Sequence, residues 1–302
     1  MAELRFDGKS VIVTGGGRGF GRQHSLLLAS RGARVVVADY GVEVDGSGSS
    51  PDPANEVVEE ITAAGGEAVA CFANVADESG AAKIVQTAVD SFGGVDVVVN
   101  NAGIWDGDWF DGVDNEQFRR MLDYHYLGTV YVCREAWPHL KQAEHGAIVN
   151  TSSEAMIGHI PKNVDYAGAK GAVYSFSRSL ALNGKLFGIR VNAIAPRGNT
   201  RMSSKEVLAR TFDRPIDEFK GEFYENMRPE YVSPAVAFLA HESCPLTGEV
   251  LVCGDRMAKR LSVIETKGIT FDEDPAPEEL LAKLDQLMDP TDAEVMTISL
   301  WG

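Results

Sequence analysis

Seven short apolar runs alternate with helical patterns along almost the whole chain, and this rhythm restricts the fold more than any other feature. Several runs, such as VVVAD and VDVVVNN, are continuously apolar rather than alternating in polarity. Continuous runs are typical of parallel strands that are buried on both faces. We therefore expect an α/β fold, a Rossmann-type doubly wound parallel sheet of about seven strands with helices on both faces. The expected strands are 10–14, 34–39, 67–73, 95–100, 146–151, 190–194 and 249–253, and the expected helices are 21–30, 54–64, 78–92, 115–140, 164–186 and 233–240.

Two segments interrupt this alternation. Residues 41–53, GVEVDGSGSSPDP, are rich in Gly, Ser and Pro, which predicts an exposed, mobile loop after the second strand. The tail beyond the last strand contains one short amphipathic helix, expected at 277–287. We expect one domain over residues 1–265 and a C-terminal extension, 266–302, that packs on the domain or on a neighbouring subunit.

A glycine cluster lies between the first strand and the first helix. The segment Val11–Gly21 reads VIVTGGGRGFG, so that Thr14 and Gly15 end the strand while Gly19 and Gly21 open the helix. Glycines allow a pyrophosphate to approach the backbone, and a helix N-terminus offers free N–H groups and a positive dipole. A glycine cluster alone is weak evidence. Its place between a strand and a helix predicts a nucleotide site.

Asp39 ends the second strand, 18 residues after Gly21. That is close to the spacing at which a carboxylate accepts hydrogen bonds from the adenosine ribose. A carboxylate there would repel a 2′-phosphate, so we expect NAD rather than NADP as the cofactor. Arg18 is a cation in the glycine loop and gives the opposite signal, because it could pair with a phosphate. The alternative for Asp39 is an ordinary turn residue at a strand end.

Tyr166 and Lys170 are four residues apart within NVDYAGAKG, a segment that we expect to be helical. The two side chains would therefore lie on one face of the helix. A phenol beside a fixed ammonium favours ionisation, so we expect the pKa of Tyr166 to fall below about 10. The phenol could then exchange a proton with a substrate alcohol near neutral pH. Taken alone, this spacing is more often a plain surface pair on a helix.

Composition excludes several classes of function. The chain has 302 residues and a formal net charge of −16, which argues against binding to nucleic acid. The four cysteines, which form no CxxC pair, indicate reduced thiols rather than disulfides or a zinc site. The first ten residues contain no apolar h-region and no apolar run approaches the length of a membrane span, so we expect neither a secretory signal nor a membrane helix. We expect a cytoplasmic protein that binds a small-molecule substrate, with no metal and no membrane contact.

Four motifs in sequence order resemble the short-chain dehydrogenase/reductase family over about residues 6–255: TGGGRGFG, NNAG at 100–103, Ser153, and Tyr166 with Lys170. The resemblance implies that Tyr166 is the catalytic acid/base, that Lys170 binds the nicotinamide ribose and lowers the phenol pKa, and that Ser153 contacts the substrate oxygen. It places Asn100, with Ala102 and Gly103, beside adenine and ribose. The implied NAD-binding residues are Thr14, Gly15, Arg18, Gly19, Phe20, Gly21, Asp39, Tyr40, Asn74, Val75, Asn101, Ala102, Gly103, Tyr166, Lys170, Pro196, Gly198 and Thr200.

The chain departs from the family pattern at three positions. His125 stands where the family has a fourth catalytic residue, an Asn that helps to route protons. An imidazole can also donate and accept hydrogen bonds, so His125 is a catalytic candidate, and a buried core histidine is the alternative. Asn74 stands where the family often has an Asp at adenine. Arg197 separates Pro196 from Gly198 in the segment that would hold the nicotinamide carboxamide.

The sequence is similar to one branch of the family, the (3R)-hydroxyacyl-CoA dehydrogenases of peroxisomal multifunctional enzymes of type 2 and their bacterial relatives. The likeness includes VDVVVNNAGI, IAPRGNTRM and RPEYVSPAVAFLAHESC. It implies oxidation of a (3R)-hydroxyacyl-CoA or a 17β-hydroxysteroid with NAD. The alternatives are another alcohol, such as a terpenoid, polyol or quinone, and a non-catalytic NAD-binding protein. The resemblance also implies a homodimer or homotetramer formed through helices 115–140 and 164–186.

The segment 202–228 is expected to form a lid over the substrate. Its apolar residues could line an acyl or sterol site, or could simply pack, and the same holds for three aromatic residues after NNAG. Four basic residues near the lid could meet CoA phosphates, with solvated surface charge as the alternative. These candidates are Leu208, Phe212, Ile216, Phe219, Phe223 and Tyr224 in the lid, Trp105, Trp109 and Phe110 after NNAG, and the basic residues Arg197, Arg201, Lys205 and Arg210.

Overall fold

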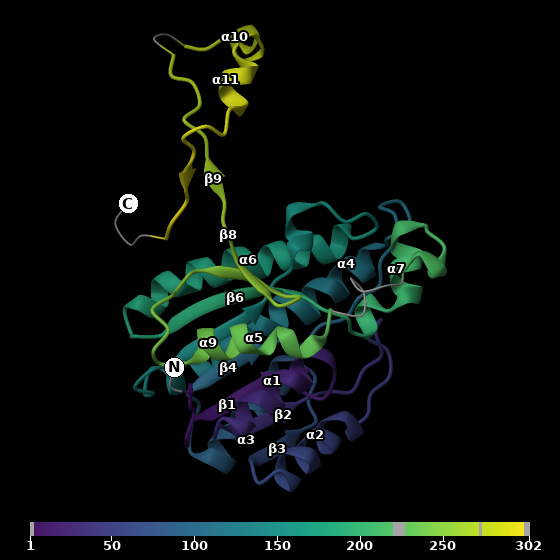
Figure 1. Ribbon diagram of the computed structural model, residues 1–302, viewed down its shortest axis with the longest axis vertical. Coiled ribbons are helices and arrows are strands. Elements are labelled where there is room, and N and C mark those ends of the chain that lie inside the picture. The colour runs from purple at the N-terminus through teal and green to yellow at the C-terminus, as the bar shows by residue number, and fades with distance from the viewer. Residues whose placement is uncertain (1–2, 220–226, 272–273, 299–302) are drawn as a thin grey trace.

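The centre of the molecule is an eight-stranded sheet in the order β3-β2-β1-β4-β5-β6-β7-β8 (Figure 1). This computed structural model describes the chain apart from residues 1–2, 220–226, 272–273 and 299–302. Strands β1 to β7 are parallel, and β8 is antiparallel to β7. The bounds are β1 Ser10–Thr14, β2 Arg34–Ala38, β3 Glu67–Cys71, β4 Val97–Asn100, β5 Ala147–Thr151, β6 Arg190–Arg197, β7 Val250–Gly254 and β8 Met257–Leu261. The predicted doubly wound parallel sheet is confirmed.

The central strands are buried on both faces because successive side chains enter two different cores. In β1, Val11 and Val13 pack into one core, whereas Ile12 packs into the other. This arrangement explains why the sequence of each central strand is continuously apolar. The prediction missed β8, whose sequence MAKRL carries two cations and is largely exposed at the edge of the sheet.

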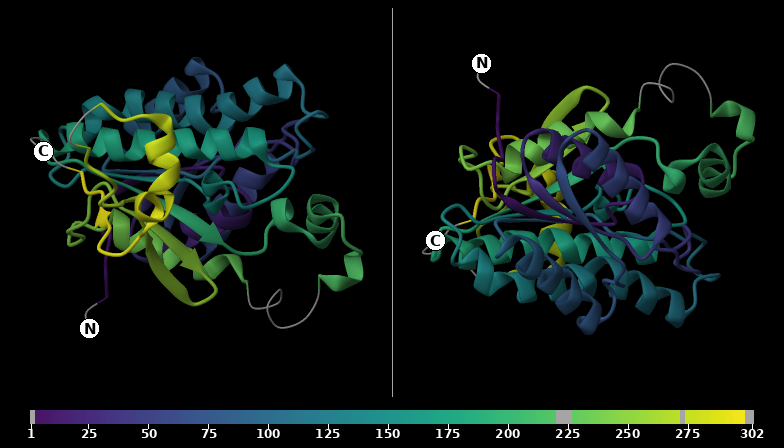
Figure 2. Two further views of the ribbon diagram at one scale, coloured as in Figure 1. Left: turned by 90° about the horizontal axis from the view of Figure 1, so that it is seen from above. Right: turned by 90° about the horizontal axis from the view of Figure 1, so that it is seen from below.

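Two layers of helices cover the sheet, as the views along its edge show (Figure 2). One layer contributes to the core around Val11 and the other to the core around Ile12. Helix α3 has the bounds that the sequence predicts, and so has α9. The first layer consists of α1 Gly19–Ser30, α2 Asp52–Ala63 and α9 Ser233–Ala240, and the second of α3 Glu78–Phe92, α5 Gly128–Leu140 and α6 Val164–Lys185.

The expected single helix over residues 115–140 is wrong in one respect. Helix α4, Asn115–Leu122, passes into a π-helical turn, η1, at Asp123–Leu127, and only then into α5. A π-helical turn inserts a residue into the helix and turns the following side chains around its axis. Such turns are frequent at functional sites, and this one carries His125.

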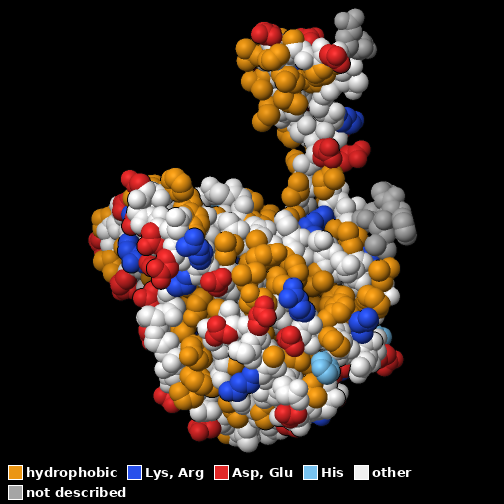
Figure 3. All heavy atoms as spheres, turned by 180° about the vertical axis from the view of Figure 1, so that it is seen from behind, with side chains coloured by type: hydrophobic (Ala, Val, Ile, Leu, Met, Phe, Trp, Pro, Cys, Tyr) orange, Lys and Arg blue, Asp and Glu red, His pale blue; other side chains and the backbone are white. Residues whose placement is uncertain are grey.

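The C-terminal arm, residues 262–298, projects from the edge of the sheet next to β8 (Figure 1). Its stem is a two-stranded ribbon of β9, Ile264–Glu265, and β10, Glu294–Val295, and its end carries two short helices. The expected single helix at 277–287 is wrong, because the chain breaks at Lys283 into α10, Pro277–Ala282, and α11, Leu284–Met288. Hydrophobic side chains gather at this end of the arm (Figure 3), where the exposed ones are Leu280, Leu281, Leu284 and Met288.

Candidate active site

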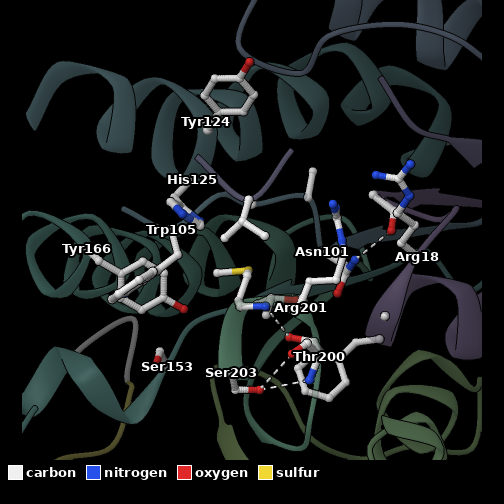
Figure 4. Close-up of a pocket in the computed structure, with 18 of the residues that line it drawn as sticks. Arg18, Asn101, Trp105, Tyr124, His125, Ser153, Tyr166, Thr200, Arg201 and Ser203 are labelled. Atoms are coloured by element: carbon white, nitrogen blue, oxygen red, sulfur yellow. Dashed lines mark hydrogen bonds between the residues drawn. The ribbon is translucent and has the colours of Figure 1, made fainter. Parts of the chain in front are cut away.

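A pocket of about 340 Å³ opens at the carboxyl ends of the parallel strands (Figure 4). In a doubly wound sheet this is the edge at which ligands bind, next to the point where the strand order reverses. Here β1 lies between β2 and β4. From β1 the strand order continues through β2 to β3 on one side and through β4 to β8 on the other. The pocket is lined by the predicted residues Gly15, Arg18, Gly19, Phe20, Asp39, Tyr40, Asn74, Val75, Asn101, Ala102, Gly103, His125, Ser153, Tyr166, Lys170, Pro196, Gly198 and Thr200.

The glycine loop between β1 and α1 fits a phosphate group. A Cβ on Gly15 would lie 2.8 Å from the Ala102 Cα, and a Cβ on Gly21 would overlap the Gly15 carbonyl oxygen. Close backbone packing therefore requires glycine at both positions. Arg18, the N-cap residue of α1, makes no side-chain cap, so this helix start keeps free N–H groups for an anion. The residues that are present fit the pyrophosphate of a dinucleotide.

The Asp39 carboxylate lines the pocket and accepts hydrogen bonds from two segments of backbone. Its Oδ2 accepts a hydrogen bond from Gly17 N at 2.8 Å, and its Oδ1 accepts one from Gly41 N at 2.7 Å. The carboxylate therefore joins the glycine loop to the start of the next loop. Because each oxygen has a second lone pair, both remain able to accept hydrogen bonds from a ribose.

Three residues that were predicted beside the cofactor hold the scaffold instead. The Thr14 hydroxyl accepts hydrogen bonds from the backbone N–H groups of Asn101 and Ala102, at 3.0 and 3.1 Å. Gly21 packs against Gly15, and neither Thr14 nor Gly21 lines the pocket. Asn100 was also expected at the adenine side, but its buried amide donates to Asn150 Oδ1 at 2.9 Å, beneath the site. That placement of Asn100 is wrong.

The loop that follows β2 is less exposed than its composition predicts. Val42 and Val44 line the pocket, and the Val44 carbonyl oxygen accepts a hydrogen bond from Trp105 N at 2.7 Å. Val42 also packs against the small buried cluster of Ile104, Met121 and Ala169. Val42 and Val44 therefore form part of the pocket wall, whereas Glu43 and the following Gly/Ser-rich part reach solvent. The alternation of Val with acidic residues in VEVD is the signal that could have predicted this.

Ser153, Tyr166 and Lys170 come together from two elements. Ser153 follows β5, and its Oγ accepts a hydrogen bond from Ala155 N at 3.1 Å. Tyr166 and Lys170 lie one turn apart on α6, with Lys170 Nζ 5.5 Å from the centre of the Tyr166 ring. Lys170 Nζ donates to the Thr151 carbonyl oxygen at 2.7 Å, which fixes the buried ammonium at the end of β5. Figure 4 shows Tyr166 and Ser153 facing the same part of the pocket.

The predicted fall of the Tyr166 pKa does not occur in this structure. Burial raises the pKa of the Tyr166 phenol to about 12, although its hydrogen bond with Ser153 acts in the opposite direction. Burial also lowers the pKa of the Lys170 ammonium to about 7. Both groups are removed from water, and desolvation disfavours the charged form of each. The spacing of the two residues correctly predicts their proximity, but it contains no information about this burial.

His125 lies beside this group and is fully enclosed. Its ring meets the Tyr166 ring edge-on, with 5.0 Å between the centroids. The Nε2 atom lies 2.7 Å from the Ile104 carbonyl oxygen, an arrangement in which Nε2 carries the proton, while Nδ1 has no hydrogen-bond partner among the described residues. Burial, followed by the charge of Lys170, holds the pKa of His125 well below its ordinary value. The imidazole is therefore neutral.

The segment after β6 forms the opposite wall of the pocket. Thr200 begins a short 3₁₀ turn, η3 Arg201–Ser203, in which the Thr200 hydroxyl accepts a hydrogen bond from Met202 N at 3.2 Å. The Ser203 hydroxyl donates to the Gly198 carbonyl oxygen at 3.0 Å. These bonds fix the backbone between Pro196 and Thr200, where the resemblance places the carboxamide of a nicotinamide.

Part of the segment expected to form a lid is helix α7, Lys205–Phe212. Its apolar side chains line the pocket, and the buried Trp105 does too, whereas Trp109 and Phe110 are exposed and outside the lining. Ile216 and Phe219 are not in the lining either, and Phe223 and Tyr224 lie outside the described residues. On this side of the pocket the apolar lining residues are Trp105, Ile160, Met202, Val207, Leu208 and Phe212.

The three arginines among the basic residues near the lid are held by acidic partners. Arg197 pairs with Glu154, Arg201 with Glu43 at 3.2 Å, and Arg210 with Asp106 at 3.8 Å. The guanidinium of Arg210 also lies 5.0 Å from the centre of the Trp105 ring. These arginines connect parts of the pocket wall, a role that the sequence alone did not indicate.

Two negative findings apply to the residues that the structure describes. Among them no helix has both the length and the apolar character needed to cross a membrane. Among the same described residues, no group of three or more His, Cys, Asp or Glu side chains is placed so that it could hold a metal ion.

Comparison with known proteins identifies the family. The sequence profile described as short chain dehydrogenase matches residues 9–210, which include the glycine loop and the Ser153, Tyr166 and Lys170 group. The chain belongs to the short-chain dehydrogenase family. It is an oxidoreductase. The fold and the family that the sequence analysis predicts are both confirmed. The family model and NAD-bound neighbours support the binding of a nicotinamide dinucleotide.

Solved structures and curated relatives extend this assignment. This short-chain dehydrogenase superposes on one from Mycobacterium avium with a TM-score of 0.78 and 36% identity, over 98% of both chains. It superposes on carveol dehydrogenase from Mycobacterium avium in complex with NAD with a TM-score of 0.75 and 26% identity, over 83% of this chain and 97% of the other. It is 40% identical to the peroxisomal multifunctional enzyme type 2 of Mus musculus over 83% of its own length, which is 32% of that enzyme.

Proposed function

We propose that this short-chain dehydrogenase oxidises a secondary alcohol to a ketone with NAD, and that its substrate is a (3R)-hydroxyacyl-CoA thioester. One observation carries the proposal: the Tyr166 hydroxyl lies with Ser153 in a pocket that helix α7 lines with the apolar side chains of Val207, Leu208 and Phe212. A polar pair in the same pocket as an apolar surface suits an alcohol on a long apolar chain.

The side chains divide the proton chemistry between them. Ser153 Oγ accepts a hydrogen bond from Ala155 N, and its O–H, which bonds with Tyr166 here, would turn to the substrate oxygen. Tyr166 takes the proton of the substrate hydroxyl as general base. Bound NAD supplies the hydride acceptor and a positive charge that favours the phenolate. Lys170, fixed by the Thr151 carbonyl oxygen, stabilises the same charge from behind, and His125 Nδ1 is the remaining acceptor beside Tyr166.

The preference for NAD over NADP rests on Asp39. Its two oxygens are fixed by Gly17 and Gly41, so the carboxylate cannot turn away from a ligand in this part of the pocket. A 2′-phosphate would meet that charge at short range. Arg18, the expected counter-charge, is directed to the Val42 carbonyl oxygen and Glu43.

The thioester is favoured by the 40% identity to peroxisomal multifunctional enzyme type 2, although the chain covers only 32% of that protein. A terpenoid alcohol is the second candidate, because a solved carveol dehydrogenase has a TM-score of 0.75 to this chain and the pocket is apolar around Trp105 and Leu208. A 17β-hydroxysteroid is the third. The cytoplasmic location, the homo-oligomer and the division at residue 265 stay predictions.

The decisive assay follows the absorbance of the reduced nicotinamide, with NAD and NADP in parallel. The alcohols are (3R)- and (3S)-hydroxyacyl-CoA, carveol and a 17β-hydroxysteroid. We expect NAD-dependent turnover of the (3R) thioester and little of its (3S) isomer. Turnover of carveol or the steroid alone would replace the substrate assignment, and equal rates with NADP would refute the role of Asp39.

A further inference from the structure

Arg197 and Glu154 form a bidentate ion pair at the edge of the pocket. Arg197 Nε donates to Glu154 Oε2 at 2.5 Å, and Arg197 Nη2 donates to Glu154 Oε1 at 2.6 Å. Two parallel bonds fix both the distance and the angle between the partners, as a single contact does not. The Glu154 carboxylate is only 20% exposed, so solvent competes with this pair less than with most surface pairs.

The pair joins two segments that must be aligned with each other. Glu154 directly follows Ser153, which is the N-cap of the short 3₁₀ turn η2, Glu154–Ile157. Arg197 ends β6 and directly precedes Gly198 on the opposite wall of the pocket. The ion pair therefore connects the side of the pocket that holds the substrate oxygen to the side that would hold the nicotinamide.

The two segments differ in how firmly they are held. Arg197 lies in register with Gly254 of β7, so its backbone is part of the sheet. The η2 turn has four residues and ends at the exposed Ile157. It packs against α6 through the buried Ala155 and through Met156, but its backbone is not part of the sheet. Glu154 thus adds a polar tie between a short turn and a strand of the sheet.

We infer that Arg197 and Glu154 are positioning residues that hold Ser153 in register with the wall formed by Gly198 and Thr200. This inference rests on the proposed function, since it assigns the pair to the alignment of an alcohol carbon with the nicotinamide ring. Neither side chain takes part in the chemistry, and each acts through the segment that it fixes. Small displacements of reacting groups cost large factors in rate.

Contact with the phosphates of CoA is the competing role for Arg197. The bidentate bond already uses two of the donors on the guanidinium fork, and Glu154 neutralises its charge. A phosphate ligand would affect only substrates that carry CoA. A positioning residue would affect every alcohol that the enzyme oxidises.

The test uses the full chain with Glu154→Gln and Arg197→Lys, each of which keeps size and polarity but removes the bidentate bond. We expect kcat to fall about tenfold in both variants. KM for the alcohol and Kd for NAD should stay within about twofold. The loss should be equal for the CoA thioester and for an N-acetylcysteamine thioester of the same acyl chain, which has no phosphates.

Hydrogen exchange provides a measurement that needs no substrate. Because the Ala155 N–H is bonded to Ser153 Oγ, both variants should exchange faster than the wild type in the peptide that covers residues 153–158. The matched control is the bidentate pair of Arg260 and Glu249, at 2.7 and 2.8 Å, which lies outside the pocket lining. Arg260→Lys and Glu249→Gln should change neither kcat nor exchange in this peptide.

The outcomes separate the two claims. Unchanged kcat and unchanged exchange in both variants would overturn the positioning role. So would an Arg197→Lys loss that is confined to KM and vanishes with the truncated thioester, or an equal loss in the control pair. If the wild type oxidises none of the alcohols, the proposed function fails, while the exchange measurement still decides whether the pair holds the Ser153 turn.

Discussion

The two halves of the pocket are built in different ways. The cofactor half consists of strand ends and the glycine loop, where backbone atoms meet directly and Asp39 is bonded to Gly17 N and Gly41 N. The lid half consists of helix α7, which is held against the body by side chains. Lys162 Nζ donates to the Arg210 carbonyl oxygen at 2.8 Å and pairs with Asp213.

The difference between backbone packing and side-chain contacts indicates which half of the site can move. The cofactor half cannot change without breaking the sheet, because its strands are buried on both faces. The lid half can detach when a few ion pairs open, since each of these pairs has at least one exposed partner and contributes little. We therefore expect changes in the cofactor half to alter binding or stability, and changes in the lid to alter substrate handling alone.

The largest expected effect comes from Tyr166, which lies where the two halves meet. Tyr166→Phe removes the general base, and turnover should fall by about 1000-fold or more. Kd for NAD should stay within about twofold, because the phenol contributes little to cofactor binding. Tyr174→Phe is the matched control on the same helix, since its buried hydroxyl has no described partner. Full activity in Tyr166→Phe would refute the mechanism.

A smaller effect is expected from Asp39. Asp39→Asn removes the charge that orders two backbone N–H groups and that we propose faces the ribose. Hydrogen bonds to a charged group contribute about 1.5–3 kcal/mol, so Kd for NAD should rise by about 10- to 100-fold. Affinity for NADP should rise relative to NAD. Calorimetric titration with both cofactors measures this, with the exposed Asp45→Asn as the control. An unaltered preference would show that Asp39 only holds the backbone.

The rigidity of the cofactor half predicts a pH dependence of stability. His24 is buried between α1 and α9, where its Nδ1 contacts the Ser233 hydroxyl at 2.8 Å, and burial lowers its pKa to about 3. The unfolded chain binds a proton at this residue below about pH 6.5, but the folded chain does not, so stability falls as the pH falls from 6.5 toward 3. Between pH 7 and pH 5 this amounts to about 2 kcal/mol.

Urea unfolding of the cofactor-free protein at both pH values tests this. The wild type should lose about 2 kcal/mol more than His24→Gln between pH 7 and pH 5. His145→Gln, at a half-exposed position, should behave as the wild type does. Equal pH dependence in the wild type and in His24→Gln would mean that water reaches this core.

The sequence predicted the cofactor half well because its constraints are local. A continuously apolar run gives a buried strand, and the prediction of β1 matches the structure at both ends. Glycines at fixed intervals after that strand correctly predicted a closely packed loop between β1 and α1. The spacing of Tyr166 and Lys170 gave their common face. In each case the residues that interact are close in the sequence or follow strands that share one edge of the sheet.

The parts that could not be predicted depend on contacts between distant segments. Val44 is bonded to Trp105, and Arg197 to Glu154, 43 residues away. Nothing in a Gly/Ser-rich loop or in an isolated arginine identifies such a partner. Burial is a property of the whole fold too, which explains why the direction of the Tyr166 pKa was wrong. The contacts that attach α7 to the body, such as that of Lys162 with the Arg210 carbonyl oxygen, belong to this second class.

The smallest expected effect concerns the attachment of the lid. Lys162→Met keeps a long side chain at this buried position but removes the ammonium that contacts the C-terminal end of α7. A loss of about 1 kcal/mol in the closed lid would raise KM for the alcohol by about fivefold. The rate at saturating substrate and Kd for NAD should remain close to the wild type.

Steady-state kinetics and cofactor titration of the same preparation measure this separation. Lys267→Met is the control, because its ammonium pairs with Asp292 in the C-terminal arm, at 3.5 Å and outside the pocket lining. If Lys162→Met weakened NAD binding as much as it raised KM, the two halves of the pocket would be coupled. The lid would then be part of the cofactor site, and the division between a rigid half and a detachable half would be wrong.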